Sequence, residues 1–279
     1  MSTNRELFFK YRKQGIPDRV IYFSLEECND FDHLLLTQNF DQEIRDEKRF
    51  VSAMDRYQNG EMIEYVFNKA YFLNKQFYIN KTVLIPRQET EQLVLSSIRM
   101  IKEMFSDVKI TTVDLCTGSG IIGISIANEF KYNRIILADI SPEALAVAKV
   151  NIDKNSLNSN ISILEGDLLE PLLKENIKAD VIICNPPYIE NPMTIDERTW
   201  KQEPHLALLA KPATCFYERV LKDLAKITND RFLVCFEIGE DMEMALTDLV
   251  NKYCPESLYF FEDDIYGKRR FLFIKKTNF

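Results

Sequence analysis

DLCTGSGIIG spans residues 114–123 and connects an apolar stretch, residues 108–113, with a helix-like segment that begins at Ile124. This order predicts a strand, a glycine-rich turn and the start of a helix. Unpaired backbone N–H groups and the helix dipole favour an anionic group at such a turn, and glycines let the backbone approach a ligand closely. The spacing G-x-G-x-x-G also fits the dinucleotide fingerprint, but a single match of this kind has low specificity. The turn therefore predicts a ligand site whose cofactor must be identified from other residues.

Two acidic residues follow the next two predicted strands. Asp139 ends the apolar segment 135–138, about 20 residues after the turn, where folds of this type place an acid on a ribose diol. Asp167 follows the apolar segment 161–164. The ligand of such a fold lies at the carboxyl ends of the strands, which is where both acids are expected. The alternative for each is a solvated acid at a strand end, without a ligand.

A third motif, Asn185-Pro186-Pro187-Tyr188, comes directly after the apolar run 181–184. The run is typical of a buried strand, and two prolines prevent a ladder or a helix from continuing, so the backbone must turn in a fixed shape. The Asn185 amide is both donor and acceptor, Pro186 offers a carbonyl group, and Tyr188 offers a flat ring. This set suits the binding of a planar –NH2 group.

The chemistry of amide and aromatic amine nitrogens explains why such a set is useful. Their lone pair is delocalised, so an enzyme that alkylates them must orient the nitrogen and accept its N–H protons as charge develops. The Asn185 side-chain oxygen and the Pro186 carbonyl are the candidate acceptors, while Tyr188 would stack on the planar group and exclude water. A strand-terminating turn without a function is the alternative.

The order of predicted elements indicates an α/β fold. Helix and strand signals alternate from about residue 87 onward, which predicts a mostly parallel sheet with helices on both faces. Ser141 and Pro142 have the residue types of an N-cap and a first helical position, for a helix through Asn151. Further strands are expected at residues 232–236, 258–261 and 271–274.

The first third of the chain differs in character. Residues 1–75 show a helical spacing of apolar side chains and predict a small helical bundle. Residues 72–83 have the pattern of a hairpin with Asn80-Lys81 as its turn. We therefore expect a helical domain at 1–75, a β-hairpin linker at 76–86 and a catalytic domain at 87–279.

Taken together, the motifs resemble the release factor glutamine methyltransferases, or HemK family, within the class I S-adenosylmethionine-dependent methyltransferases. The resemblance covers nearly the whole chain, and the combination is far more specific than any single motif. Besides the glycine-rich turn and Asn185 to Tyr188, it depends on the segments 84–91 (LIPRQETE), 203–208 (EPHLAL) and 237–239 (EIG).

The resemblance implies a Rossmann-like methyltransferase domain with a mostly parallel seven-stranded sheet, preceded by a helical bundle and a linking β-hairpin. It implies that a methyl group passes from S-adenosyl-L-methionine, which becomes S-adenosyl-L-homocysteine, to a glutamine side-chain nitrogen, N5. The glutamine would be that of the Gly-Gly-Gln motif in class 1 peptide-chain release factors, whose body the helical domain would recognise. The enzyme would thus support translation termination.

The resemblance also assigns roles to residues of this sequence. It assigns to the cofactor Cys116, Thr117, Gly118, Ser119, Gly120, Asp139, Asp167, Leu168 and Asn185. It assigns to catalysis and to the substrate glutamine Asn185, Pro186, Pro187 and Tyr188.

Three positions depart from the family pattern. Cys116 stands where glycine is common, Met242 stands where glutamine often follows Glu-Ile-Gly, and residues 213–215 lack a usual glycine. None of them belongs to the substrate-binding tetrapeptide, so the expected type of reaction is unchanged.

Composition narrows the class of protein independently. The 279 residues are 46% apolar but contain no run of about 18 apolar residues, and the start of the sequence lacks the apolar segment of a signal peptide. We therefore expect a cytoplasmic enzyme without a membrane span. The six cysteines show no C-x-x-C spacing and are expected to be reduced, packed thiols. Two isolated histidines give no reason to expect a metal centre.

Charge bears on the rival functions. The formal net charge is −8, whereas a duplex-binding enzyme normally shows a basic stripe, so direct nucleic-acid binding is not expected. An N6-adenine methyltransferase, which uses a similar tetrapeptide on a flipped base, could still hide a basic face within an acidic total. Methylation of a glutamine on a ribosomal protein would use the same pocket with a different docking domain. A non-enzymatic binding module would require a broken site, and none of the key positions is broken.

Overall fold

The computed structural model describes residues 2–106, 108–155, 157 and 160–277. The chain forms two compact units. The smaller unit contains Met1–Lys69 and Glu197–Gln202, and the larger unit contains Ala70–Asp196 and Glu203–Phe279. The segment Glu197–Gln202 thus belongs by its contacts to the smaller unit, although the chain on either side of it belongs to the larger one.

Short helices build the smaller unit around one apolar core. Their bounds are α1 (Asn4–Lys13), α2 (Asp18–Asn29), α3 (His33–Gln38), α4 (Glu47–Gln58), α5 (Ile63–Phe67) and α10 (Glu197–Gln202). Leu7, Leu25 and Phe50 come from α1, α2 and α4 and are almost completely buried together. In α10, the Arg198 guanidinium lies 4.0 Å from the centre of the Tyr57 ring. The helical character predicted for the N-terminal part of the chain is confirmed.

Polar side chains begin several of these helices. The Thr3 hydroxyl accepts the backbone N–H of Glu6, while the Glu6 carboxylate accepts the backbone N–H of Thr3. Asp32 and Asp46 accept backbone N–H groups in the first turns of α3 and α4. Each bond satisfies a donor that the helix leaves without a partner at its N-terminus.

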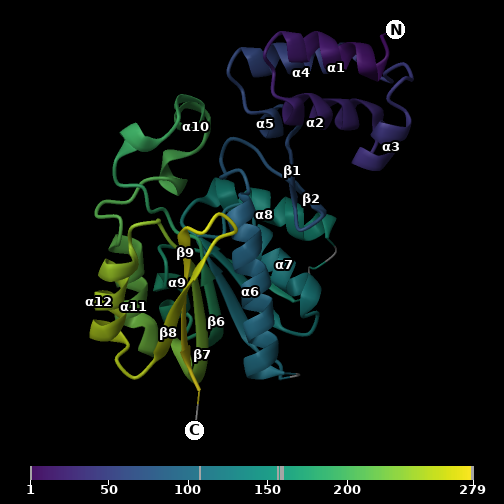
Figure 1. Ribbon diagram of the computed structural model, residues 1–279. Helices are drawn as coiled ribbons and strands as arrows, with labels where there is room; N and C mark the ends of the chain where they lie inside the picture. Colours follow the sequence, from purple (N-terminus) through teal and green to yellow (C-terminus); the bar gives the residue numbers. More distant parts are fainter. Residues whose placement is uncertain (1, 107, 156, 158–159, 278–279) are drawn as a thin grey trace. The chain divides into compact units, whose positions relative to one another are not determined.

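The larger unit is a sheet between two layers of helices (Figure 1). A two-stranded hairpin, β1 (Lys69–Phe72) and β2 (Lys75–Tyr78), precedes the sheet in the chain. The strands of the sheet are β3 (Thr111–Leu115), β4 (Arg134–Asp139), β5 (Ile161–Glu165), β6 (Ala179–Cys184), β7 (Thr228–Glu237), β8 (Leu258–Asp263) and β9 (Arg269–Lys276). The α-helices are α6 (Gln88–Phe105), α7 (Ile121–Glu129), α8 (Pro142–Lys154), α9 (Glu170–Lys174), α11 (Cys215–Ile227) and α12 (Glu243–Tyr253), and the 3-10 helices are η1 (Pro192–Thr194) and η2 (His205–Ala207).

The order of the strands in the sheet is β5-β4-β3-β6-β7-β9-β8. The first five strands are parallel, and β9 is antiparallel to both of its neighbours. After β3 the chain continues to β4 and β5 on one side, and it then returns to β6 on the other side of β3. Loops at the carboxyl ends of β3 and β6 therefore diverge and leave a crevice, which is where sheets of this type bind ligands.

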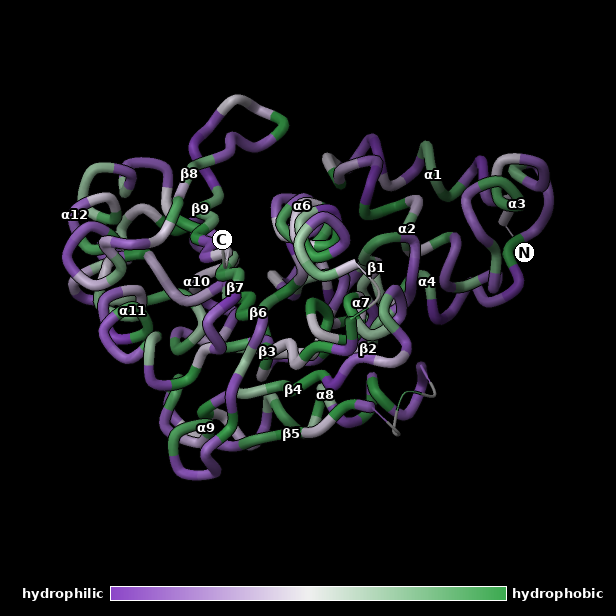
Figure 2. Tube along the Cα trace, turned by 90° about the horizontal axis from the view of Figure 1, so that it is seen from below, coloured by the Kyte–Doolittle hydropathy of each residue, from purple (hydrophilic) through white to green (hydrophobic). Residues whose placement is uncertain are grey.

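Alternate side chains of each strand face two separate apolar cores. Ile182 and Val234 pack with α9, α11 and α12, whereas Ile183 and Leu233 pack with α6, α7 and α8. This alternation follows from the two-residue period of a strand. Figure 2 shows hydrophobic colours along the central strands, which lie between the two layers of helices. Burial on both faces explains why these strands are continuous apolar runs in the sequence.

The α/β class and the mostly parallel seven-stranded sheet are confirmed, as are strands at the apolar segments named above. The predicted start of α8 is also correct, because Pro142 is its first residue and the Ser141 hydroxyl accepts the backbone N–H of Ala144. The boundaries expected between functional domains, at residues 75 and 86, remain predictions.

The hairpin lies earlier in the chain than the sequence predicts, and Asn80-Lys81 is the wrong turn. The turn between β1 and β2 is formed by Leu73 and Asn74, whose φ angles are 46° and 60°. Two positive φ angles match the right-handed twist of a tight hairpin, and asparagine adopts them readily. Asn80 instead accepts the backbone N–H of Thr82 at 2.9 Å, in a local turn after the hairpin. Residue type alone could not separate these two asparagines.

Candidate active site

The glycine-rich turn joins β3 to α7 in a conformation that needs its glycines. Gly118 and Gly120 have φ angles of 53° and 81°, in the left-handed region that favours glycine. Cys116 also has a positive φ, 57°, which explains why glycine suits this position in the family pattern. A Cβ at Gly120 would lie 3.1 Å from Ala148 Cβ and 3.2 Å from Leu137 Cδ1. The turn is therefore pressed against α8 and β4.

A buried carboxylate, Asp114, supports the turn from inside. Its Oδ2 accepts the Thr117 hydroxyl at 2.5 Å and the Gly123 backbone N–H at 2.9 Å. Burial raises the pKa of Asp114 to about 7, although both hydrogen bonds oppose this rise. One acid thus connects the beginning of the turn with the first turn of α7. No motif in the sequence assigned a role to Asp114.

Asp139 lies at the end of β4 and contacts the same turn. Its Oδ2 accepts the Gly118 backbone N–H at 2.8 Å, and its Oδ1 accepts the Ser141 backbone N–H at 3.0 Å. Burial raises the pKa of Asp139, and these backbone hydrogen bonds partly offset the rise. A carboxylate offers about four acceptor positions, so Asp139 still has acceptor capacity for a diol.

Asp167 and Leu168 follow β5 and line the same crevice as the glycine-rich turn and Asp139. The Asp167 Oδ2 lies 2.6 Å from Arg219 Nη2 of α11. Leu168 has a φ of 50° and is largely buried. The ion pair with Arg219, which the sequence analysis did not anticipate, fixes the orientation of the Asp167 carboxylate.

The tetrapeptide after β6 is held from behind by hydrogen bonds. Asn185 Nδ2 donates to the Thr90 hydroxyl of α6 at 3.2 Å. The Tyr188 hydroxyl donates to Glu237 Oε1 of β7 at 3.4 Å. Pro186 is buried beneath this corner. Neighbouring elements therefore brace both polar side chains of the motif.

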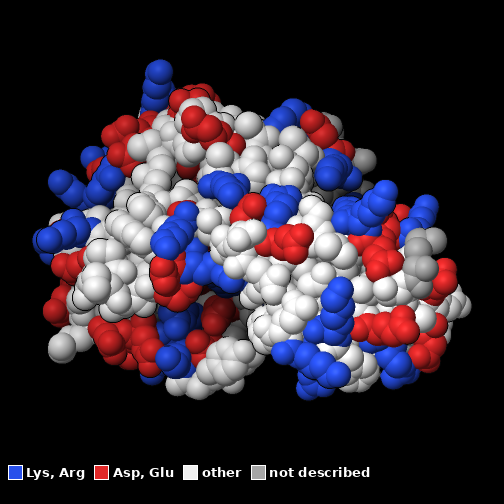
Figure 3. All heavy atoms as spheres, turned by 90° about the horizontal axis from the view of Figure 1, so that it is seen from above, with Lys and Arg blue, Asp and Glu red and all other residues white. Residues whose placement is uncertain are grey.

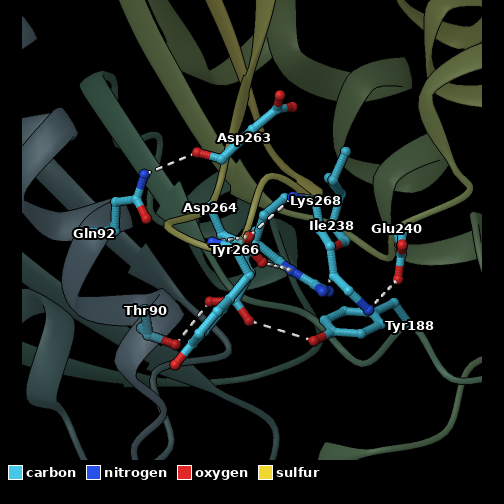
Figure 4. Close-up of polar contacts among 11 residues, drawn as sticks. Thr90, Gln92, Tyr188, Ile238, Glu240, Asp263, Asp264, Tyr266 and Lys268 are labelled. Atoms are coloured by element: carbon cyan, nitrogen blue, oxygen red, sulfur yellow. Dashed lines mark hydrogen bonds and ion pairs between the residues drawn. The ribbon is translucent and has the colours of Figure 1, made fainter.

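Glu237 is the centre of these contacts. Its Oε2 accepts the Thr90 hydroxyl at 2.7 Å, and Figure 4 shows how Thr90 and Tyr188 contribute to this network. Burial raises the pKa of Glu237 to about 7, while the hydrogen bond from Thr90 and the charge of Arg270 lower it. Arg270 is itself held by the Ile238 carbonyl at 3.1 Å. A carboxylate that is 2% exposed thus lies directly behind the predicted catalytic corner.

An ion pair holds the segment 203–208 beside the corner. Arg87 Nη2 lies 2.6 and 2.8 Å from the two carboxylate oxygens of Glu203, whose side chain is fully buried. Burial raises the pKa of Glu203, and Arg87 opposes the rise. Pro204 and Leu206 of this segment then line the cavity. The pair joins the segment LIPRQETE to the segment EPHLAL beside the cavity.

These elements enclose a cavity of about 380 Å³, a size typical of small-molecule sites. Of the residues that the sequence analysis assigned, those along its wall are Cys116, Thr117, Gly118, Ser119, Asp139, Asp167, Leu168, Asn185 and Pro187. Gly120 lies under the turn rather than along the wall, and Pro186 and Tyr188 lie at the back of the corner. One cavity therefore brings together assigned residues that are up to 71 positions apart in the sequence, from Cys116 to Pro187.

Several wall residues were not found by sequence reasoning. Thr90 and Arg87 belong to a segment that the resemblance quoted without giving it a role, and Phe216 and Arg219 come from α11. The Glu-Ile-Gly segment at the end of β7 was a signal for Glu237, because an acid at the end of an apolar strand is expected at this edge. No comparable signal marks the residues of α11.

In the part of the chain that the structure describes, no cluster of three or more His, Cys, Asp or Glu side chains could hold a metal ion. None of the helices described has the length and apolar composition needed to cross a lipid bilayer.

The known proteins that resemble this chain in sequence or structure are methyltransferases. Residues 92–202 match the family described as methyltransferase small domain. A release factor glutamine methyltransferase of Mycoplasma mycoides subsp. mycoides SC is 36% identical over 261 residues, which are 91% of each chain. That of Bacillus subtilis is 37% identical over 226 residues, 80% of this chain and 78% of its own. A solved ribosomal protein L11 methylase from Lactobacillus delbrueckii subsp. bulgaricus has a TM-score of 0.51 at 19% identity, covering 71% of this chain and 84% of its own, and shares the fold.

Proposed function

Because the chain belongs to the release factor glutamine methyltransferase family, we propose that it methylates N5 of the glutamine in the Gly-Gly-Gln motif of class 1 peptide-chain release factors. The methyl donor is S-adenosyl-L-methionine, and S-adenosyl-L-homocysteine is the second product. One observation carries the proposal: Asn185, the residue suited to orient an amide, lies along the same cavity as the glycine-rich turn.

The residues of the cavity fit this donor. Asp139 retains acceptor capacity for a ribose diol, and the turn exposes backbone along the wall where glycine leaves room. Ile140 and Leu168 offer apolar surface for a base, with the Asp167 carboxylate beside them. Cys116 to Ser119, Asp139, Asp167 and Leu168 would hold the donor, and when bound it supplies an electrophilic methyl group.

The substrate side of the site is the Asn185 corner. Asn185 Oδ1 and the Pro186 carbonyl accept the two N–H groups of the glutamine amide, so the nitrogen lone pair is directed toward the cavity and away from water. Tyr188 braces the corner from behind, because its hydroxyl is tied to Glu237. Positioning of this kind lowers the barrier because both reactants are held rather than brought together by diffusion. The surplus proton leaves the product nitrogen after the transfer.

The remainder of the chain supplies substrate choice. The helical part at residues 1–75 recognises the body of the release factor, while its Gly-Gly-Gln loop enters the cavity. Lys and Arg side chains are interspersed with Asp and Glu on the surface seen in Figure 3, a distribution that favours a protein substrate over a DNA duplex. The proposal places the enzyme in the cytoplasm, where release factors act.

The test is methylation of a co-purified release factor, followed by mass spectrometry of its Gly-Gly-Gln peptide. We expect the mass increase of one methyl group on the glutamine, and a turnover about 10²–10³-fold lower in Asn185→Ala. Asn229→Ala is the matched control, since Asn229 is exposed at the start of β7 and lies outside the cavity wall. An unmodified peptide with wild-type enzyme, beside DNA or a ribosomal protein that is methylated, contradicts the proposal.

A further inference from the structure

A chain of hydrogen bonds runs from Asn185 into the interior of the larger unit. Asn185 Nδ2 donates to Thr90 Oγ1 at 3.2 Å, and Thr90 Oγ1 donates to Glu237 Oε2 at 2.7 Å. Thr90 is 3% exposed and Glu237 is 2% exposed, so water cannot readily replace either partner. The three residues come from the loop after β6, from α6 and from the end of β7.

The chemistry of these groups gives the series of hydrogen bonds a direction. An ionised carboxylate only accepts hydrogen bonds, so it takes the single proton of the Thr90 hydroxyl. The hydroxyl oxygen can then only accept from Asn185, and the –NH2 group is the only donor of that carboxamide. With Nδ2 turned toward Thr90, the carbonyl oxygen Oδ1 is turned away from it. Glu237 therefore determines, through Thr90, which end of the Asn185 amide is available at the corner.

We propose that Thr90 and Glu237 are positioning residues that set the Asn185 carboxamide with its oxygen toward the substrate amide. The inference rests on the proposed function, because only a substrate with N–H groups requires an acceptor at this place. The opposite orientation would present –NH2 to –NH2, and two donors facing each other cannot form a hydrogen bond.

The direction of these hydrogen bonds depends on the charge of Glu237. A protonated Glu237 can donate to Thr90, whose own proton then points to the amide and selects the flipped orientation. The titratable groups that face Glu237 are Glu89 of α6, Tyr188 after β6 and Arg270 of β9, and the Tyr217 hydroxyl of α11 donates to its backbone carbonyl at 2.8 Å. Arg270 favours the ionised carboxylate, while burial and Glu89 favour the neutral one. The pKa of about 7 that results allows both forms near neutral pH.

The first experiment replaces the hydroxyl alone. Thr90→Val keeps the shape of the side chain, and we expect kcat for the release factor to fall ~10- to 100-fold, while the dissociation constant of S-adenosylhomocysteine, measured by calorimetry, changes less than about twofold. Thr90→Ser should recover most of the lost turnover because it restores the hydroxyl. Thr112→Val in β3 is the matched control, since Thr112 is also buried but its hydroxyl has no hydrogen-bond partner among the described residues. Wild-type turnover in Thr90→Val, with intact folding by circular dichroism, overturns the proposal.

The second experiment follows the amide itself, in the free protein, and so does not depend on the reaction. The ¹⁵N side-chain resonance of Asn185, assigned from its absence in Asn185→Asp, should shift with an apparent pKa near 7 as Glu237 titrates. The shift should disappear in Glu237→Gln, although Asp114, which has a similar pKa, still titrates there. A shift that persists in Glu237→Gln overturns the inference.

The two experiments separate failure of the inference from failure of the proposed function. If the wild-type enzyme leaves the release factor unmethylated, the proposed function is wrong, even where the Asn185 resonance titrates as expected. If it methylates the release factor but kcat at pH 6 and pH 8 changes equally in wild type and Glu237→Gln, the positioning role is wrong. With the role intact, wild-type kcat rises through pH 7, and Glu237→Gln gives a low and flat profile.

Discussion

Gly123, in the first turn of α7, is the position where the fold and the candidate site are most directly coupled. A Cβ at this position would lie 2.1 Å from Leu137 Cδ2, whereas real Cβ atoms essentially never approach other atoms closer than 3.0 Å. The two atoms would have to separate by at least about 0.9 Å. Leu137 is fully buried on β4, so dense packing opposes rotation of its side chain and passes part of the displacement to α7 and the sheet.

The magnitude for Gly123→Ala follows from three contributions. Overpacking of a dense core costs about 1–3 kcal/mol, and displacing the Gly123 N–H from Asp114 removes part of a charge-assisted bond worth about 1.5–3 kcal/mol. The better helix propensity of alanine returns about 1 kcal/mol. We expect a net destabilisation of about 2–4 kcal/mol, which lowers Tm by roughly 5–15 °C in a unit of this size.

The assay is urea unfolding of Gly123→Ala, Leu137→Ala and the double variant. Leu137→Ala opens the space that the new methyl group needs, so the double variant should be more stable than the sum of the single effects by at least about 1 kcal/mol. Calorimetry should show weaker binding of S-adenosylhomocysteine to Gly123→Ala, because the turn moves with α7. Effects that add within about 0.5 kcal/mol would refute the steric reasoning.

Three further predictions concern charged groups. Asp139→Ala should weaken the binding of S-adenosylhomocysteine by about 1.5–3 kcal/mol in calorimetry, and an unchanged affinity would remove Asp139 from the ribose site. Arg87→Ala should lower the free energy of unfolding by about 1–3 kcal/mol because it leaves buried Glu203 without its cation, whereas Arg99→Ala, at an exposed pair on α6, should change it by less than about 1 kcal/mol. Because burial raises the pKa of Glu237 in the folded protein to about 7, its contribution to stability is present below the unfolded pKa of 4.5 and is lost as pH rises through 7. Glu237→Gln should therefore reduce the fall in unfolding free energy between pH 5 and pH 8 by roughly 3 kcal/mol. An identical fall in urea titrations of both proteins would contradict this.

The architecture could be predicted from the sequence because local signals agree with the global fold at most positions. Apolar runs such as residues 181–184 are buried on both faces of the sheet, so hydrophobicity alone located them. The Ser141-Pro142 start of α8 was predictable because capping depends on neighbouring residues only. The hairpin was misplaced because Asn74 and Asn80 are equivalent as local turn formers, and the difference between them is made by tertiary packing of β1 and β2.

The parts of the site that could not be predicted are the contacts between elements. The Asp167–Arg219 pair joins residues 52 positions apart, and the Thr90–Glu237 bond joins residues 147 apart. Neither separation leaves a periodic signal in one sequence. The motifs identified the residues that face the cavity, whereas the structure identified the residues that hold them.

Carboxylates at the carboxyl ends of the strands have one physical role in common. Asp114, Asp139 and Glu237 end or nearly end β3, β4 and β7, and burial raises the pKa of each. Each therefore destabilises the fold near neutral pH, where an amide of the same shape would avoid the cost of a buried charge. An amide, however, has donors of its own that would need acceptors in an apolar core, and it can accept or donate at the same contact. A carboxylate only accepts, so it fixes the direction of every N–H and O–H group around it. The stability given up at this edge is the cost of a site whose donors and acceptors have a single arrangement while these carboxylates are ionised.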